Sequence, residues 1–236
     1  MSTFSTVLII AMVFLLGFAG YYYLDEILPL KADIEELKQE NRALALQVEQ
    51  LEQKNAELAA RLEEQVQKLS ERKQQEINQL KATYEKLISE MNEQVEKGEV
   101  TITRLADQLK VNIVDRIIFP SGKAELSEEG INVLTRVGDI LKQSEDKQIK
   151  VAGHTDNVPI HPNLQDKFAS NWELSVARAT NVVRFLHEEV GLDAKNLEAA
   201  GYAHYRPIAS NKTKKGRARN RRIEILLLPK RQIVRN

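Results

Sequence analysis

The chain has 236 residues, 34 Lys and Arg against 34 Asp and Glu, and no cysteine. Without a thiol, the composition excludes a disulfide framework, a cysteine-ligated metal site and a lipid-modified cysteine. The balanced total hides an uneven distribution: residues 1–99 hold eleven Lys and Arg against eighteen Asp and Glu, and residues 100–236 hold twenty-three against sixteen. The chain therefore divides into an acidic amino-terminal part, net −7, and a basic carboxyl-terminal part, net +7.

Residues 7–24 form an unbroken run of apolar, small and tyrosine residues without a charge. Eighteen such residues are the lower end of the length of a membrane-spanning helix. The alternative is a cleaved signal peptide with a cleavage site near Ala19, but no Lys or Arg precedes the run, and the run continues past that site. We predict an uncleaved transmembrane anchor within residues 1–26.

Residues 27–98 have the pattern of a long α-helical coiled coil. Two sets of positions alternate along one face, namely Leu30, Leu37, Leu44, Leu51 and Leu58 with Ile34, Asn41, Val48, Asn55 and Leu62. Such heptads predict a coiled coil, and asparagine at core positions favours a parallel dimer, with a trimeric or loosely packed coil as the alternative.

Beyond Leu58 the leucine spacing changes to eleven residues, through Leu69 and Leu80 to Met91, which predicts a straighter stalk. No Pro or Gly interrupts residues 30–97. At about 1.5 Å per residue this segment predicts a rod on the order of 100 Å long. The stalk is expected to end at Gly98.

The remaining sequence predicts a linker at residues 99–110, a folded domain at 111–230 and a tail at 231–236. Residues 100–110 of the linker are expected to form a short bridging helix or strand. Strand patterns occur at 111–119, 148–152, 197–200 and 222–228, and helix patterns at 127–143 and 170–190. Two βα units followed by a further strand pairing predict an α/β (α+β) domain. Its mixed sheet has the order βαβαβ-β, and helices cover one face.

One acid and one base on neighbouring elements suggest a binding site. Asp156 follows the strand at 148–152, where α/β folds place ligands, and Arg178 lies about two turns into the next helix. The intervening segment contains Pro159 and Pro162 and is a loop that can bring the two together. A carboxylate and a guanidinium suit the two ends of a zwitterionic ligand. A structural Asp156–Arg178 salt bridge is the alternative interpretation.

Three motifs in order carry a family resemblance: GHTDN at 153–157, NWELSVARA at 171–179 and GRARNRRIEI at 216–225. Over roughly residues 111–229 the chain resembles the OmpA-like peptidoglycan-binding domain family, whose members include outer-membrane protein A, peptidoglycan-associated lipoprotein and MotB. The motif FPSGKAEL and the loop between the first two motifs resemble MotB-type members more than the lipoprotein. The resemblance implies non-covalent binding of the diaminopimelate residue in the peptidoglycan stem peptide.

The aspartate and arginine of that family fall on Asp156 and Arg178. The resemblance also places an aromatic residue near the ligand and has one of two consecutive arginines, Arg221 or Arg222, reinforcing the carboxylate site. The predicted peptidoglycan site therefore consists of Asp156, Arg178, Thr155, Asn171, Leu174, Phe119 and Arg222.

Several other functions are weighed against this one. Residues 206–222 contain eight basic and no acidic residues, as a nucleic-acid patch would, but a preceding membrane segment argues against nucleic acid. His154, His161 and Asp156 fit no metal-ligand spacing, and no nucleophile motif or cofactor box occurs, so we expect no enzyme, no metal and no cofactor. A cell-wall hydrolase is improbable for the same reason.

The main alternative is a MotB-like stator, which needs an ionisable group within its membrane span. Residues 7–24 have none. The sequence therefore predicts a single-pass inner-membrane tether, with its carboxyl-terminal domain in the periplasm, that dimerises through the coiled coil and binds peptidoglycan. The sequence leaves open whether a partner membrane protein packs on the span.

Overall fold

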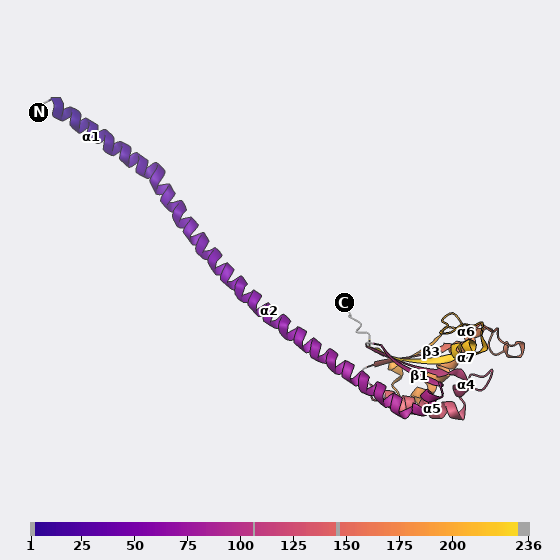
Figure 1. Cartoon of the computed structure of the whole chain (residues 1–236). Helices are drawn as coiled ribbons and strands as arrows, with labels where there is room; N and C mark the ends of the chain where they lie inside the picture. Colours follow the sequence, from indigo (N-terminus) through magenta and orange to yellow (C-terminus); the bar gives the residue numbers. More distant parts are fainter. Residues whose placement is uncertain (1–2, 106, 145–146, 231–236) are drawn as a thin grey trace. The chain divides into compact units, whose positions relative to one another are not determined.

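The computed structural model describes residues 3–105, 107–144 and 147–230, so the predicted tail at 231–236 lies outside the described residues. The chain forms two compact units, Met1–Ser70 and Glu71–Asn236. Figure 1 shows the long amino-terminal helices and the part that contains the strands. The first unit is helical, and the second contains the β-sheet; we call the second unit the head.

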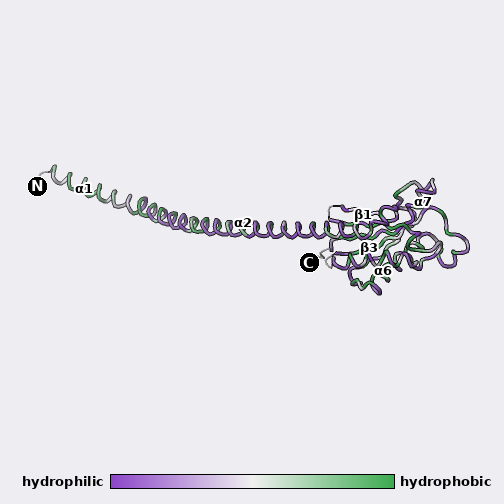
Figure 2. The backbone as a smooth tube through the Cα atoms, turned by 60° about the horizontal axis from the view of Figure 1, so that its bottom comes forward, coloured by the Kyte–Doolittle hydropathy of each residue, from purple (hydrophilic) through white to green (hydrophobic). Residues whose placement is uncertain are grey.

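The amino-terminal unit begins with helix α1, Thr3–Tyr22, followed by a π-helical turn, Tyr23–Ile27, and by α2, Leu28–Glu90. Pro29 explains the widened turn, because a proline inside a helix lacks an N–H and its ring clashes with the carbonyl four residues earlier. Among the described residues, one helical run is long and apolar enough to cross a membrane, and α1 supplies its apolar part (Figure 2).

The heptad residues of α2 are exposed in the single chain. Leu44, Val48 and Leu58 are 50%, 53% and 61% exposed. The Asn41 side chain donates to the carbonyl oxygen of Leu37 on its own helix, at 2.9 Å. A continuous apolar stripe is expected to be covered by a partner in water, so the coiled coil stays a prediction for the assembled protein.

The carboxyl end of α2 belongs to the head, which corrects the predicted stalk boundary at residue 98. Leu80, Leu87 and Met91 are 3%, 0% and 0% exposed and form part of the head's hydrophobic core. Their spacing puts them on one face of a helix. Leu80 and Met91 therefore pack in the core of the head. Their eleven-residue spacing does not mark a straighter part of the stalk. A short helix, α3, Asn92–Glu96, and a turn at Gly98, whose φ is 68°, end this segment.

The predicted linker at 99–110 is also corrected, because these residues form part of the sheet. Strand β1, Val100–Leu105, pairs antiparallel with β2, Gln108–Val114. In β1 only Val100 and Ile102 are buried, and they alternate with exposed threonines. Two inward apolar residues are a weak strand pattern, so the sequence did not distinguish an edge strand from a linker.

Five strands form one mixed sheet in the order β1-β2-β5-β3-β4. Strand β3, Lys147–His154, is parallel to β4, Leu197–Gly201, and helix α6, Asn171–Glu188, connects them. The last strand, β5, Arg222–Pro229, lies between β2 and β3 and is antiparallel to both. The predicted mixed sheet is confirmed, with β1 as an additional edge strand.

Helices α5, α6 and the end of α2 pack on one face of this sheet. Helix α5, Glu128–Leu141, begins at the predicted cap Ser127, whose hydroxyl accepts from the Gly130 N–H at 2.9 Å. The inward face of β5 presents Ile223, Ile225 and Leu227, all at most 2% exposed. Helix α6 lies so close to β3 that a Cβ added at Gly153 would be 2.1 Å from the Ser175 carbonyl oxygen. A glycine at this position fixes the approach of α6 to the strand before Asp156.

The first predicted strand, 111–119, ends early. Residues Asp115–Ile118 form a single helical turn, α4, and Phe119 follows it in extended conformation. Ile117, Ile118 and Phe119 are 2%, 0% and 2% exposed. Three consecutive buried residues do not fit the alternation of a strand with one covered face. Short 3₁₀ turns at Pro162–Leu164 and Ala194–Asn196 and a short helix α7, Lys214–Asn220, complete the head.

Candidate functional site

The topology brings the segments after β2, after β3 and before β5 together at one end of the strands. Strands β2 and β3 are both antiparallel to β5, so their carboxyl ends lie beside the amino-terminal end of β5. Asp115 directly follows β2, Asp156 lies two residues beyond β3, and Arg221 directly precedes β5. Arg178 reaches the same end of the sheet from α6. Two acids and two bases from four separate segments therefore converge.

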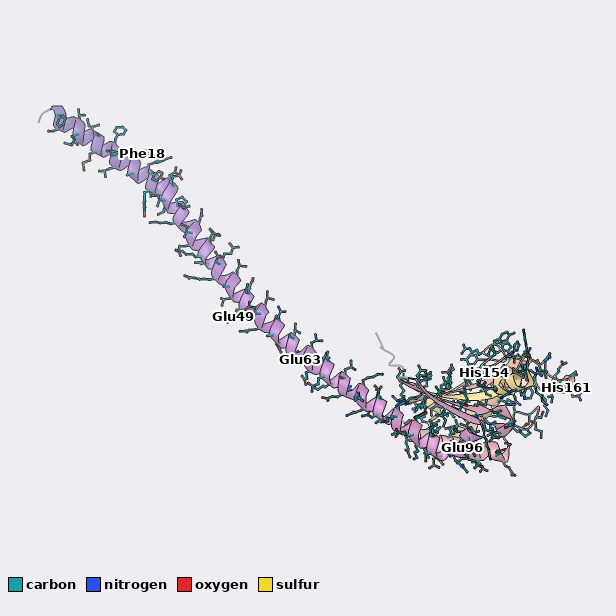
Figure 3. All side chains as sticks on the ribbon, in the orientation of Figure 1. Phe18, Glu49, Glu63, Glu96, His154 and His161 are labelled. Atoms are coloured by element: carbon teal, nitrogen blue, oxygen red, sulfur yellow. The ribbon has the colours of Figure 1, made fainter. Side chains whose placement is uncertain are left out.

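These four side chains line a cavity of about 420 Å³. Thr155, Asn171 and Leu174 line it as well. In Figure 3, His161, another lining residue, lies at the outer rim of the head. The structure thus places five of the seven predicted site residues around one cavity: Asp156, Arg178, Thr155, Asn171 and Leu174.

Arg178 is 4% exposed and is held from three sides. Its Nη1 lies 2.8 Å from Oδ1 of Asp115, and its Nε donates to the carbonyl oxygen of Lys123 at 3.0 Å. Its guanidinium lies over the Phe119 ring, 4.9 Å from the centroid. Burial lowers the pKa of Arg178 and raises the pKa of Asp115, and the attraction between the two charges opposes both shifts.

Asp156 is 6% exposed and has a different partner, Arg221, whose Nη1 contacts its Oδ2. Its Oδ1 accepts from the Val158 N–H at 3.1 Å, an Asx turn that sets the start of the loop. Asn171 donates to the Val158 carbonyl oxygen at 2.9 Å and so ties this loop to the first turn of α6. The alternative interpretation, an Asp156–Arg178 salt bridge, is not what the structure shows.

The site therefore contains two acid–base pairs, Asp115 with Arg178 and Asp156 with Arg221. A ligand that carries both an ammonium and a carboxylate can exchange with such pairs, because each of its charges finds an opposite charge already in place. Asp115 was not predicted from the sequence, and Arg221 was the unchosen alternative to Arg222. The predicted strand ran from 111 to 119 and so included Asp115, whereas β2 ends at Val114 and Asp115 directly follows it.

Two predicted site residues have other positions. Phe119 is 2% exposed beneath the Arg178 guanidinium, so it supports the arginine from the core instead of lining the cavity. Arg222 is 3% exposed and points to the opposite face of the sheet, where its Nε donates to Oε1 of Glu224 at 3.0 Å. The cavity is therefore lined by Arg221, the other of the two consecutive arginines, and not by Arg222. The physical reason is that neighbouring residues at a strand point in opposite directions.

Arg222 belongs to a buried polar cluster on the face of the sheet opposite the helices. His154, labelled in Figure 3, is 3% exposed, and its Nε2 lies 3.7 Å from Oε2 of Glu224, too far for a hydrogen bond. Burial lowers the pKa of His154. Burial by itself raises the pKa of Glu224, but its interactions with His154 and Arg222, including two hydrogen bonds from the Arg222 guanidinium, outweigh burial and hold that pKa at about 2.

This cluster predicts acid sensitivity of the fold. A carboxylate with a folded-state pKa of about 2 stabilises the head above its ordinary pKa, and this contribution is lost between about pH 5 and pH 2. We expect Glu224→Gln to lower stability at pH 7, because Arg222 loses its partner, and to flatten the loss of stability over that acid range. Glu198→Gln, which removes a more exposed carboxylate on β4, is the control. Thermal melts at several pH values that show equal acid slopes for wild type and Glu224→Gln would contradict this.

Among the described residues, no group of three or more His, Asp or Glu side chains gathers as metal ligands would.

Residues 118–221 match the OmpA family, so this part of the chain is an OmpA-family domain. Among curated proteins, Motility protein B of Bacillus subtilis is 43% identical over 125 residues, which cover 53% of this chain and 47% of that protein. The chain spans about half the length of the curated relatives it matches.

Solved structures give the same result for the fold. A putative MotB-like protein from Desulfovibrio vulgaris aligns with a TM-score of 0.60 at 25% identity, covering 69% of this chain and 98% of that one. The cell wall anchor of the T6SS from Pseudomonas aeruginosa aligns with a TM-score of 0.55 at 33% identity, covering 61% of this chain and 97% of that one. The predicted resemblance to OmpA-like domains of the MotB type is confirmed.

Proposed function

We propose that this protein is a membrane-anchored periplasmic tether whose head binds peptidoglycan non-covalently. The ligand group is the side-chain end of diaminopimelate in the stem peptide, which carries one free ammonium and one free carboxylate. Asp156 takes the ammonium and Arg178 the carboxylate. The head acts as a binding module without catalysis. The similarity to a protein described as a cell wall anchor supports this proposal.

The observation that carries the proposal is the pairing of charges inside one cavity. Both acids and Arg178 are at most 8% exposed, and burying such charges is costly unless they are paired. A ligand that brings one charge of each sign gives both Asp156 and Arg178 a new partner, and the residues it displaces, Arg221 and Asp115, are near enough to attract each other. Diaminopimelate in a stem peptide meets this condition, whereas a purely anionic or purely cationic group meets half of it.

A comparison of two stem peptides tests the ligand class. Lysine at the diaminopimelate position keeps the ammonium and lacks the carboxylate. We expect full-length protein in detergent micelles to bind the diaminopimelate peptide at least about thirtyfold more tightly, since the lysine peptide leaves the Arg178 site unfilled. Isothermal titration calorimetry measures both. Equal affinities would exclude Arg178 as the carboxylate site.

The anchor part of the proposal assigns α1 to the inner membrane and the head to the periplasm. It rests on the apolar, uncharged sequence of α1 and on the wall-binding role proposed for the head. Density-gradient separation of the two envelope membranes checks it. Recovery of the protein with the outer membrane, or in the soluble fraction, would contradict it.

The exposed heptad stripe supports dimerisation through α2. Two asparagines at core positions favour a parallel pair at a cost in stability. We expect Asn41→Leu with Asn55→Leu to raise the melting temperature of a fragment of residues 28–70 and to mix its oligomeric states. Sedimentation equilibrium measures this, and a monomeric wild-type fragment at tens of micromolar would rule out the coil.

A MotB-like stator subunit is the second candidate, favoured by the identity to Motility protein B. An ion-driven stator needs an ionisable group within its span. Helix α1 contains no Asp or Glu, and Asp25 and Glu26 lie in the π-helical turn that follows. This sequence difference favours the tether.

A further inference from the structure

The cavity holds more positive than negative charge. Its lining includes four basic side chains, Arg178, Arg221, Lys214 and Arg217, against two acidic ones, Asp115 and Asp156. The two acids are already paired with Arg178 and Arg221. Within the described part of the chain, Lys214 and Arg217 form no ion pair, and Nη1 of Arg217 donates to a neutral group, the Asn211 carbonyl oxygen, at 2.9 Å. Two cations thus remain for a ligand.

These two cations stand on α7, which is fixed firmly beside the cavity. Asn220, 0% exposed, accepts from the N–H groups of Ile208 and Ala209, both at 2.9 Å, and donates to the Ala209 carbonyl oxygen at 2.8 Å. A Cβ added at Gly216 would lie 2.0 Å from the Ser210 carbonyl oxygen. The helix is therefore packed directly on the preceding loop. The backbone that carries these basic side chains is fixed beside the cavity before a ligand arrives, so no backbone entropy is lost in placing them on binding.

A zwitterionic group alone does not match this cavity. Its two charges exchange with the two existing ion pairs and leave the excess of positive charge as it was. A ligand with one more negative charge matches better, because electrostatic complementarity favours a partner whose net charge offsets that of the site. Stem peptides supply such charges, since γ-linked glutamate keeps a free carboxylate next to diaminopimelate and the peptide ends in another.

We propose that Lys214 and Arg217 form a second anion subsite that binds another carboxylate of the same stem peptide. This inference rests on the proposed function, and it makes the head selective for stem peptides in which that carboxylate is free. Amidation of the carboxylate removes the charge and weakens binding. Peptidoglycan modified in this way is a poorer ligand than unmodified peptidoglycan.

Three synthetic tetrapeptides containing diaminopimelate test the subsite by calorimetry with the full-length protein in detergent micelles. One is unmodified, one is amidated at the glutamate carboxylate and one at the terminal carboxylate. We expect Lys214→Gln with Arg217→Gln to weaken binding of the unmodified peptide about three- to tenfold, as for two partly exposed charge contacts. Wild type should bind one of the two amidated peptides about three- to tenfold more weakly than the unmodified peptide. The double variant should bind that amidated peptide with the same affinity as wild type.

The matched control is Lys215→Gln with Arg219→Gln, which removes the same charges from α7 at exposed positions outside the cavity. This control should leave all three affinities unchanged. The subsite is overturned if the first double variant weakens all three peptides equally, if it weakens none, or if the control has the same effect. If wild type binds none of the three peptides, the proposed peptidoglycan binding fails together with the subsite. If wild type binds them and the double variant has no selective effect, only the subsite fails.

Discussion

Asp156→Asn and Arg178→Lys are each expected to weaken binding of a diaminopimelate stem peptide by about 2 to 5 kcal/mol, which is about thirtyfold or more. Asparagine keeps the shape of Asp156 and removes the charge that meets the ammonium. Lysine keeps the charge of Arg178 but loses the planar fork, which binds a carboxylate with two hydrogen bonds. It also loses the Nε contact with the Lys123 carbonyl oxygen.

The matched controls change the same residue types outside the cavity. Asp166→Asn lies in the exposed loop before α6, and Arg184→Lys replaces a 64% exposed arginine on α6 itself. Calorimetry and pull-down with purified peptidoglycan sacculi measure binding, and circular dichroism melts report folding. If the site variants remain folded and bind as the controls do, Asp156 and Arg178 have no ligand role. If binding is lost only where melting shows unfolding, the two residues are structural.

Leu87→Ala is expected to destabilise the head by about 2 to 5 kcal/mol, as for the removal of a fully buried leucine side chain. Leu87 lies on α2, in a segment that heptad reasoning assigned to the stalk, yet it is 0% exposed within the head core. The matched control is Leu69→Ala on the same helix, where the leucine is 69% exposed.

Unfolding by urea, followed through Trp172, separates the two variants. Trp172 is the single tryptophan of the chain and lies on α6, so its fluorescence reports on the head alone. The expected result is a lower midpoint for Leu87→Ala and a midpoint near wild type for Leu69→Ala. Equal midpoints for the two variants would mean that the head folds without the end of α2, and that its boundary lies nearer residue 98.

Strong periodic patterns in the sequence predicted the main elements of the head. Helix α6 was predicted from its cap at Ser170 to within two residues of its end, and β3 and β5 were found because their buried residues repeat along the strand. The edge strand β1 was left undecided between a helix and a strand, and the single helical turn α4 was missed, since each contributes only two or three apolar residues. Tertiary packing, rather than local propensity, defines such short elements.

Sequence motifs predicted part of the cavity lining. Asp156 and Arg178 line one cavity, as expected, but their ion-pair partners, Arg221 and Asp115, depend on the antiparallel insertion of β5 between β2 and β3. That strand order is a long-range property of the chain. The choice between Arg221 and Arg222 similarly depends on where β5 begins, because a shift of one residue exchanges the two faces of a strand.

A crystal structure of the head with a bound diaminopimelate stem peptide tests the central claim most directly. We predict that the ligand ammonium lies within hydrogen-bond distance of the Asp156 carboxylate and that Arg221 has moved away from it. The ligand carboxylate should contact Arg178, whose Nε remains on the Lys123 carbonyl oxygen. A peptide bound elsewhere on the head, with the Asp156–Arg221 and Asp115–Arg178 pairs intact, would contradict the proposed site.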